Sequence, residues 1–240
     1  MLQQTFLHLP GVGEATEKKW WKQGRTDWSS VLASSCRDDW REILEASQMA
    51  LASRQWTYFD SALSNVHKWR IWDELGTHAL FVDIETDGGT DPDSITVIGT
   101  FDGRQTRSFV KDENLQDAVE YMEQFPLLVS FNGVFFDLPV LRKRFPHRLQ
   151  NHFHLDLRFP LQRLGLTGGL KNIERQLGIV RSDSTTGLTG WDAVRLWREW
   201  RYGSGAALEV LLKYNAEDVR NLLPLAELVY TRSRAQLPLP

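Results

Sequence analysis

The stretch Ala79–Glu85, with the sequence ALFVDIE, is an apolar, β-prone run that ends in two carboxylates. Side chains two positions apart on a strand point to the same face, so Asp83 and Glu85 are predicted to project side by side. The turn-like residues 86–89, TDGG, place this pair at a strand end. Burial of two unpaired carboxylates is unfavourable, whereas hard cations compensate them well. A solvated strand end is the alternative interpretation, because an Asp-x-Glu triplet is common.

A third carboxylate follows another apolar strand. Residues 127–131, LLVSF, predict a buried strand that leads into Asn132-Gly133, and a predicted helix begins near Asp137. Aspartate is a favoured helix N-cap, and Pro139 suits a first helical turn. Considered alone, Asp137 is therefore better explained as a helix cap than as a metal ligand.

The fourth carboxylate lies on a late predicted helix. Tyr214 and Asp218 are one turn apart on this helix and therefore share a face. Asp218 lies among leucines and valines, and an acid beside an apolar stripe is either paired or bound to a metal. An aspartate at the edge of the stripe is the equally weighted alternative.

Together these elements resemble the motifs of the DEDD (DnaQ-like) exonucleases of the ribonuclease H-like superfamily. Those enzymes carry Asp-x-Glu on the first strand, an Asn…Phe/Tyr-Asp motif at a later strand-to-helix turn, and Tyr-x3-Asp on a late helix. The tyrosine is typical of the DEDDy branch, which includes the proofreading domain of DNA polymerase I. The chain is also similar to bacterial ribonuclease H-like domain proteins, over roughly residues 76–230. The matching motifs are Asp83-Ile84-Glu85, Asn132-x3-Phe136-Asp137 and Tyr214-x3-Asp218.

This resemblance implies a 3′–5′ exonuclease that hydrolyses phosphodiester bonds with two divalent ions about 4 Å apart. Asp83 would bridge both ions, Glu85 and Asp218 would complete the first, and Asp137 would hold the second. Tyr214 would position the attacking water, because a free tyrosine with a pKa near 10 is a poor base at neutral pH. The all-oxygen ligand set indicates Mg²⁺ or Mn²⁺.

The order of predicted elements indicates an α/β fold, a ribonuclease H-like mixed sheet flanked by helices, with a small all-α N-terminal appendage. Strands that first meander and then alternate with helices favour this class. Residues 1–75 contain no convincing strand, so we predict a helical N-terminal region at 1–75 and a ribonuclease H-like exonuclease domain at 76–240. The predicted strands are 79–84, 94–101, 106–110, 127–131 and 152–157. The predicted helices are 14–21, 28–32, 38–51, 60–75, 115–124, 137–145, 158–164, 169–177, 190–201 and 205–223.

Three residues are candidate nucleic-acid contacts: Asn132, Lys171 and Arg142. Lys171 follows Gly168-Gly169 at a predicted helix start, where free N–H groups suit a phosphate, although a plain loop-to-helix junction explains them too. Arg142 belongs to a basic cluster after the Asp137 helix, and a solvated face is its default interpretation. Asp156, at another predicted strand end, is expected to support the site rather than to act in it.

The segment Leu9–Thr16, with the sequence LPGVGEAT, resembles the hairpin of helix-hairpin-helix modules. In such hairpins, a Gly-x-Gly turn offers backbone N–H groups to a DNA phosphate. Glu14 and Glu17 do not favour a phosphate there, so packing or partner docking remains the alternative. The ten tryptophans, several of them between Trp191 and Trp200, are interpreted as helix-packing anchors rather than base-stacking platforms.

Composition limits the function classes. The formal net charge of −3 means that any grip on nucleic acid must be local or through bound metal. The single cysteine excludes an internal disulfide, and we find no signal peptide and no membrane span, so a cytoplasmic protein is expected. The expected partner is nucleic acid, DNA or RNA, with a 3′ end as the substrate. The alternatives are a non-catalytic nucleic-acid- or protein-binding module, and an endonuclease or junction-resolving enzyme on the same metal site.

Overall fold

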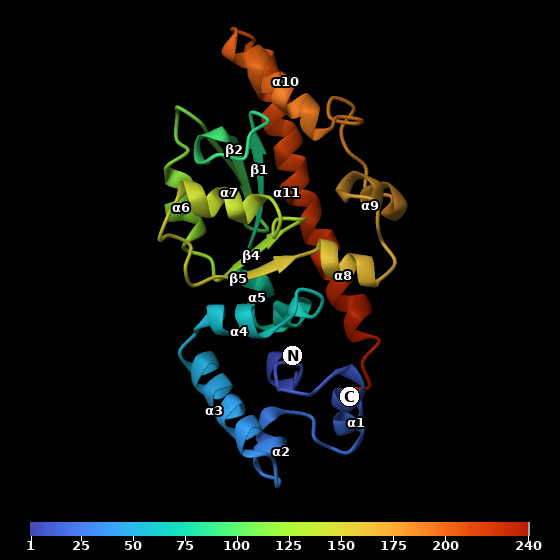
Figure 1. The fold of residues 1–240 in the computed structure, drawn as a ribbon. Coiled ribbons are helices and arrows are strands. Elements are labelled where there is room, and N and C mark those ends of the chain that lie inside the picture. The colour runs from blue at the N-terminus through green and yellow to red at the C-terminus, as the bar shows by residue number, and fades with distance from the viewer. Residues whose placement is uncertain (240) are drawn as a thin grey trace.

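A five-stranded mixed sheet forms the centre of the molecule in the computed structural model, which describes residues 1–239 (Figure 1). The strand order is β3-β2-β1-β4-β5. β1 pairs with β2, and β2 with β3, in antiparallel fashion, whereas β1 with β4 and β4 with β5 are parallel. The predicted mixed α/β fold is therefore confirmed. The strands are β1 (Ala79–Thr86), β2 (Ile95–Phe101), β3 (Thr106–Val110), β4 (Leu127–Ser130) and β5 (Phe153–Asp156).

Helices surround this sheet and extend the molecule at both ends (Figure 1). None of the helices in the described part of the chain combines the length and the hydropathy needed to cross a membrane. The α-helices are α1 (Glu14–Lys22), α2 (Trp28–Leu32), α3 (Asp38–Ala52), α4 (Trp56–Ala62), α5 (Trp72–Leu75), α6 (Asp117–Met122), α7 (Asp137–Arg144), α8 (Arg158–Arg163), α9 (Leu170–Leu177), α10 (Gly190–Arg201) and α11 (Gly205–Arg234). Short 3₁₀ helices are η1 (Leu2–Gln4), η2 (Lys68–Ile71), η3 (Gly76–His78) and η4 (Pro92–Ser94).

The alternation of side chains on β1 places the acids on one face of the sheet. Leu80, Val82 and Ile84 point into a core shared with α6 and α7. Ala79 and Phe81 belong to the opposite core, which α11 covers. Because strand side chains alternate, Asp83 and Glu85 continue the Ala79–Phe81 row and face α11.

Helix α11 is longer than the sequence predicted. The predicted helix ended at residue 223, but the observed helix runs through Pro224 to Arg234. A proline inside a helix removes one backbone hydrogen bond. Buried side chains on both sides of Pro224, including Leu222, Leu225 and Val229, pack into the main core, and this packing outweighs the local preference.

The N-terminal helices pack against one end of the sheet and share its core (Figure 1). One apolar cluster joins Phe6 and Trp28 to Phe81 of the sheet and Val229 of α11. The boundary near residue 76 stays a prediction.

One local prediction for the N-terminal region differs from the structure. The helix predicted at 60–75 is divided into α4, η2 and α5, and the break lets buried Arg70 reach Glu17, with Nη1 and Nη2 at 2.7 and 2.8 Å from its two carboxylate oxygens. Within the described chain, only the 3₁₀ helix η1 precedes the predicted hairpin, whose Leu9 and Val12 are buried in the core. The resemblance covers the hairpin alone, and DNA binding by this segment stays a prediction.

Candidate active site

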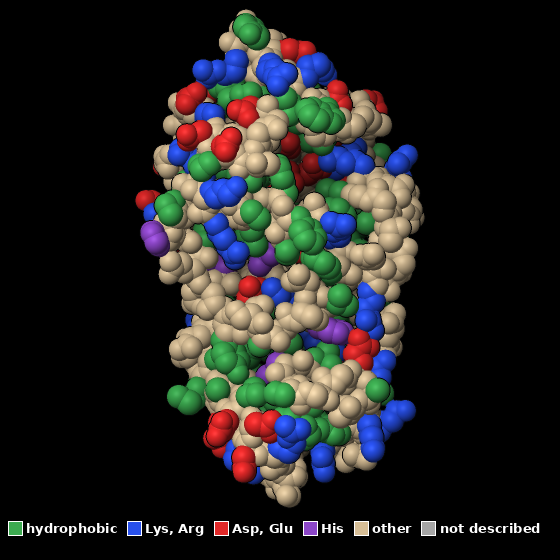
Figure 2. All heavy atoms as spheres, viewed as in Figure 1, with side chains coloured by type: hydrophobic (Ala, Val, Ile, Leu, Met, Phe, Trp, Pro, Cys, Tyr) green, Lys and Arg blue, Asp and Glu red, His purple; other side chains and the backbone are tan. Residues whose placement is uncertain are grey.

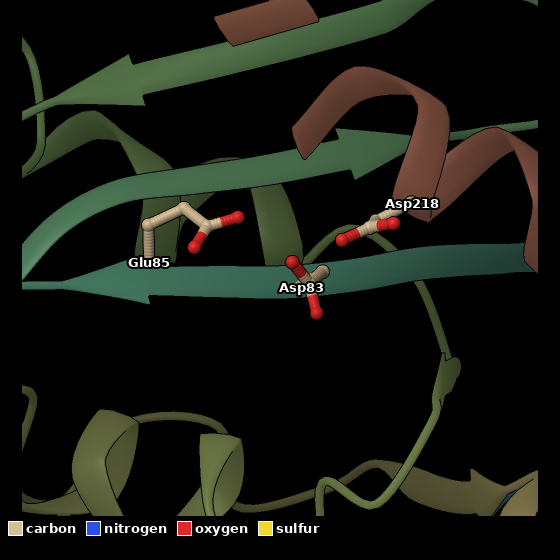
Figure 3. Close-up of side chains that lie close together, drawn as sticks. All are labelled: Asp83, Glu85 and Asp218. Carbon is tan, nitrogen blue, oxygen red and sulfur yellow. The ribbon is translucent and has the colours of Figure 1, made fainter. Parts of the chain in front are cut away.

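Three carboxylates converge where α11 crosses β1. Asp83 and Glu85 come from β1, and Asp218 comes from α11. One oxygen of each lies within 4.8 Å of the others. Figure 3 shows the Glu85 and Asp218 carboxylates reaching toward the space above Asp83. Glu85 and Asp218 are buried and Asp83 is half-buried, so the group is only partly open to water.

Asn215, one turn before Asp218 on α11, connects the helix to the strand acids. Its fully buried side-chain amide donates to Asp83 Oδ2 at 2.9 Å and to Glu85 Oε1 at 3.3 Å. Asn215 was not among the site residues predicted from the sequence. Its spacing was the available signal, because residues three apart on a helix are neighbours and Asn215 therefore shares the face of Asp218.

Gly99 makes room for this connection. It pairs with Asp83 across β1 and β2, and a Cβ at Gly99 would lie 1.7 Å from Asn215 Oδ1. A glycine in a strand often marks such a close approach. The helix carrying Asp218 can therefore lie directly over Asp83.

We expect Gly99→Ala to destabilise the fold and to disturb the acids, because Asn215 must move away from Asp83. Overpacking of this kind costs about 1–3 kcal/mol, measurable by chemical denaturation. Gly205→Ala is the matched control, since a Cβ there meets nothing within 4 Å. Equal stability of Gly99→Ala and the control would contradict this account of the packing.

Asp137 approaches the same cluster from α7. Its Oδ1 accepts a hydrogen bond from Ile84 N, between the two β1 acids, at 3.1 Å. Within the described chain, the Asp137 side chain makes no capping hydrogen bond, and Phe136 is the N-cap of α7. The capping explanation is therefore wrong. Asp137 instead accepts the hydrogen bond of the Ile84 N–H on β1, which lies beyond Phe81, the last β1 residue paired with β4.

Asp156 shapes the loop that delivers Asp137. It is fully buried at the end of β5 and accepts hydrogen bonds from Asn132 N at 2.7 Å, Val134 N at 3.1 Å and Arg158 N at 3.0 Å. Asn132 has a φ of 67°, a left-handed conformation that asparagine tolerates better than most residues. The supporting role expected for Asp156 is confirmed by these contacts.

The clustered carboxyls hold their protons more tightly than isolated ones. Burial, followed by the charges of Asp218 and Glu85, raises the pKa of Asp83 well above its usual range. Burial and the charge of Asp218 raise the pKa of Glu85 to about 8. Burial is also the main cause that raises the pKa of Asp137 to about 7. Negative charge in this site is therefore under-compensated in the metal-free protein.

These shifts predict how the stability of the metal-free protein depends on pH. The folded state holds protons on Glu85 and Asp137 that the unfolded chain releases near its ordinary pKa values of about 4 to 4.5. Below about pH 6.5 this effect is opposed by His8, His67 and His154, because burial lowers the pKa values of these histidines and their contribution to stability rises with pH. From about pH 6.5 to about 8, the folded pKa of Glu85, stability should therefore fall as pH rises. Thermal melts in EDTA should show this decrease. Glu85→Gln should flatten it, and a steady rise in stability over this range would contradict the prediction.

Two cations partly balance the acids on the α11 side. Lys171 Nζ lies 2.6 Å from Asp218 Oδ2, and Arg181 Nη2 bonds Asp218 Oδ1. Arg181 also forms a bidentate pair with buried Glu174, both contacts at 2.6 Å. Asn221 Nδ2 donates to the same glutamate at 2.9 Å. Arg181 was not predicted from the sequence, because it and Asp218 lie on separate segments of the chain.

Tyr214 lies at the centre of this arrangement, one turn before Asp218. It is buried, with the Lys171 ammonium 4.3 Å from its ring centroid. Burial, followed by the charges of Asp218 and Glu85, raises the pKa of the Tyr214 phenol. The phenol therefore stays protonated at neutral pH, which suits a hydrogen-bond donor and not a base.

The acids line a cavity of about 880 Å³, visible as a hollow with Asp and Glu side chains inside it (Figure 2). Asp137, Asn132, Lys171 and Tyr214 line the same cavity. Arg142 does not join them, because it lies on the exposed side of α7 and lines a separate cavity of about 450 Å³. The predicted nucleic-acid contact of Arg142 therefore lies outside the acidic cleft.

The donor set fits a hard divalent cation. The convergent atoms are carboxylate oxygens, which Mg²⁺ and Mn²⁺ prefer. The raised pKa values of Asp83 and Glu85 mean that their ionised forms are destabilised, and a cation bound nearby would stabilise these forms. Lys171, about one-third exposed on a flexible stem, can leave Asp218 more easily than the buried Arg181 can.

Comparisons with known proteins agree with this fold. The sequence model of the RNase_H superfamily matches residues 80–230, more than half of the chain. In structure, the chain is similar to a family B DNA polymerase from the hyperthermophilic archaeon Pyrobaculum calidifontis, with a TM-score of 0.50 and 18% identity. That match covers 63% of this chain but only 24% of the polymerase, so it shows a shared fold alone. No curated protein shows a significant match.

The matched region begins at Leu80 on β1 and ends at Tyr230 near the end of α11, so it includes all four candidate acids. The match supports nuclease activity in general. The family is assigned by this match over residues 80–230 and not by any single motif. The chain belongs to the RNase_H superfamily.

Proposed function

We propose that the protein is a divalent-metal-dependent nuclease, a 3′–5′ exonuclease of the DEDDy type. The observation that carries the proposal is the convergence of Asp83, Glu85 and Asp218 within 4.8 Å in a cavity large enough for a nucleotide. Asp137 lies beside them through its hydrogen bond to Ile84 N. Such carboxylate sets suit Mg²⁺ or Mn²⁺, which activate water and stabilise the leaving oxygen of a phosphodiester when bound.

In this proposal the chain's own residues hold and orient the reacting groups. Asp83, Glu85 and Asp218 would hold one cation, and Asp83 with Asp137 would hold a second. Asn215 fixes the orientation of Asp83 and Glu85 through its amide. The protonated Tyr214 hydroxyl orients the water that attacks the phosphorus. The fixed Arg181 keeps one oxygen of Asp218 engaged and leaves the other for a cation.

Two of the predicted nucleic-acid contacts fit the cavity. Lys171, on α9, and Asn132, on the loop after β4, both line it. Lys171, once released from Asp218, is free to approach a substrate phosphate. Lys171→Ala should therefore raise the KM for the nucleic acid by a larger factor than it weakens the affinity for the metal. Steady-state kinetics measures the first effect and calorimetry measures the second.

The test is a panel of end-labelled single- and double-stranded DNA and RNA, incubated with Mg²⁺, Mn²⁺ or EDTA. The proposal predicts stepwise shortening from the 3′ end that needs the metal. It fails if no substrate shortens with either metal. A 3′-phosphorylated substrate tests the polarity, because an enzyme that acts on a free 3′ end should be slowed by the blocked end.

Two other functions remain as outcomes of the same panel. A circular single strand has no end, so its cleavage would indicate an endonuclease or junction-resolving enzyme on the same acids. Metal binding and oligonucleotide binding without any hydrolysis would indicate a non-catalytic member of the superfamily, since related folds often change function.

A further inference from the structure

Helix α10 carries an exposed stripe that begins at the acidic cavity. Trp191, Arg195, Arg198 and Tyr202 are spaced by four, three and four residues and therefore share one helix face. The opposite face packs against α11 through Ala193, Leu196 and Trp197. We call these four residues the α10 stripe.

The aromatic ends of the stripe are unusually open. Trp191 is 77% exposed and Tyr202 is 92% exposed, whereas Trp197 on the opposite face is buried. Trp197 thus fits the prediction that the tryptophans between residues 191 and 200 are packing anchors, but Trp191 does not. Exposed apolar residues scattered singly are normal on a protein surface, so the informative feature is that these two rings share one helix face with two arginines.

The two arginines between them are available to an anion. Arg198 is exposed and has no carboxylate within ion-pair distance among residues 1–239. Arg195 pairs with Glu199 at 2.6 Å and with Asp192 at 3.4 Å, and its side chain remains 53% exposed. Exposed ion pairs of this kind contribute little to stability and exchange readily for a phosphate. Figure 2 shows Lys and Arg side chains at this end of the molecule, beyond the hollow that contains the acids, together with several Asp and Glu side chains.

The stripe is continuous with the cavity. Trp191 lines the same cavity as Asp83 and Asp218. From there α10 leads away from the sheet to the end of the molecule opposite the N-terminal helices (Figure 1). Eleven helical steps separate Trp191 from Tyr202, about 16 Å, which corresponds to roughly five stacked nucleotides.

We propose that the α10 stripe binds the segment of a single nucleic-acid strand that lies beyond the acidic cavity. This inference rests on the proposed function and names its substrate class as an unpaired strand of several nucleotides. Bases stack on Trp191 and Tyr202, and backbone phosphates contact Arg195 and Arg198. A duplex keeps its bases stacked inside the helix, where the two rings cannot reach them.

The test measures binding of fluorescein-labelled oligo-dT and oligo-U, from about two to about ten nucleotides long, by anisotropy. The full chain is used in EDTA, so that hydrolysis does not interfere. Affinity should rise with length and then level off at about six nucleotides. Tyr202→Ala should weaken binding of the longest oligonucleotides about fivefold or more and leave the shortest unchanged. Tyr202→Phe, which keeps the ring, should bind like the wild type.

The arginines are tested through the salt dependence. Arg198→Ala should lower the slope of log affinity against log salt by about 0.7, the loss of one phosphate contact on a single strand. Arg232→Ala is the matched control, because it removes one exposed arginine near the far end of α11. All these side chains are exposed, and circular dichroism confirms that the variants fold.

The inference is overturned if Tyr202→Ala and Arg198→Ala bind long oligonucleotides like the wild type, or if Arg232→Ala loses as much as Arg198→Ala. It is also overturned if the Tyr202→Ala substitution weakens binding of a blunt duplex as much as it weakens binding of the single strand. If instead both variants bind long oligonucleotides like the wild type, a protein is left as the partner of the stripe. Binding without hydrolysis refutes the proposed function alone, whereas hydrolysis with unaltered binding by the variants refutes this inference alone.

Discussion

Asp83→Asn is expected to reduce metal-dependent hydrolysis by at least about a thousandfold, because Asp83 lies between the other acids and would contact both cations. The same change should stabilise the metal-free protein, since it removes one charge from a group in which burial and neighbouring carboxylates already raise the pKa of Asp83. Opposite effects on rate and on stability distinguish loss of a ligand from loss of the fold. Initial rates with Mn²⁺ and thermal melts in EDTA measure the two effects.

Asp93→Asn is the matched control for this experiment. Asp93 is 84% exposed and pairs only with Arg144 at the surface. The control should alter neither the rate nor the melting temperature appreciably. If Asp83→Asn hydrolyses nucleic acid within about tenfold of the wild type, Asp83 is not a ligand of the catalytic metal.

Arg181→Met is expected to lower the free energy of unfolding by about 3–5 kcal/mol, the usual consequence of removing one partner from a buried charge pair. Arg181 is 7% exposed, and its partners Glu174 and Asp218 are 2% and 5% exposed. Both carboxylates would lose a charge-assisted hydrogen bond while remaining out of water. Denaturant unfolding monitored by tryptophan fluorescence measures the loss.

A second substitution separates the ion pair from general packing. Arg181→Met combined with Glu174→Met should recover much of the lost stability, because well-packed apolar side chains often replace a buried pair without loss. An arginine in an exposed pair, Arg37 with Asp39, is the control, and Arg37→Ala should leave stability essentially unchanged. A small loss in Arg181→Met, comparable with that control, would contradict the structural role of the pair.

The site acids were predictable because strand and helix periodicity determine which side chains share a face. Asp83 and Glu85 lie two apart on β1, and Tyr214 and Asp218 lie one turn apart on α11, as the spacing predicted. Local periodicity also located most strands and helices, because apolar residues with a period of 2 or 3.6 form one face that can be buried in a core only as a strand or a helix. It failed at Pro224, where burial of the neighbouring leucines outweighs the local signal.

The rest of the site depends on contacts between distant segments, which a single sequence does not reveal. Arg181 reaches Asp218 across 37 positions of the chain, and Asn215 reaches Asp83 across 132. Arg142 follows Asp137 by little more than one helical turn, yet it lies on a different surface because residues five apart on a helix point in different directions. Trp191 begins the same helix as the buried Trp197, but only the structure shows that it faces the cavity mouth.

The most direct test of the proposed metal site is anomalous scattering from a crystal of the protein soaked in Mn²⁺. We expect a peak coordinated by oxygens of Asp83 together with Glu85 or Asp218, at distances of about 2.0–2.2 Å, typical of small divalent ions. We also expect that Lys171 has moved from Asp218 Oδ2 while Arg181 has kept Oδ1. No peak at these acids at saturating Mn²⁺, with Lys171 still bound to Asp218, would contradict the proposed metal site.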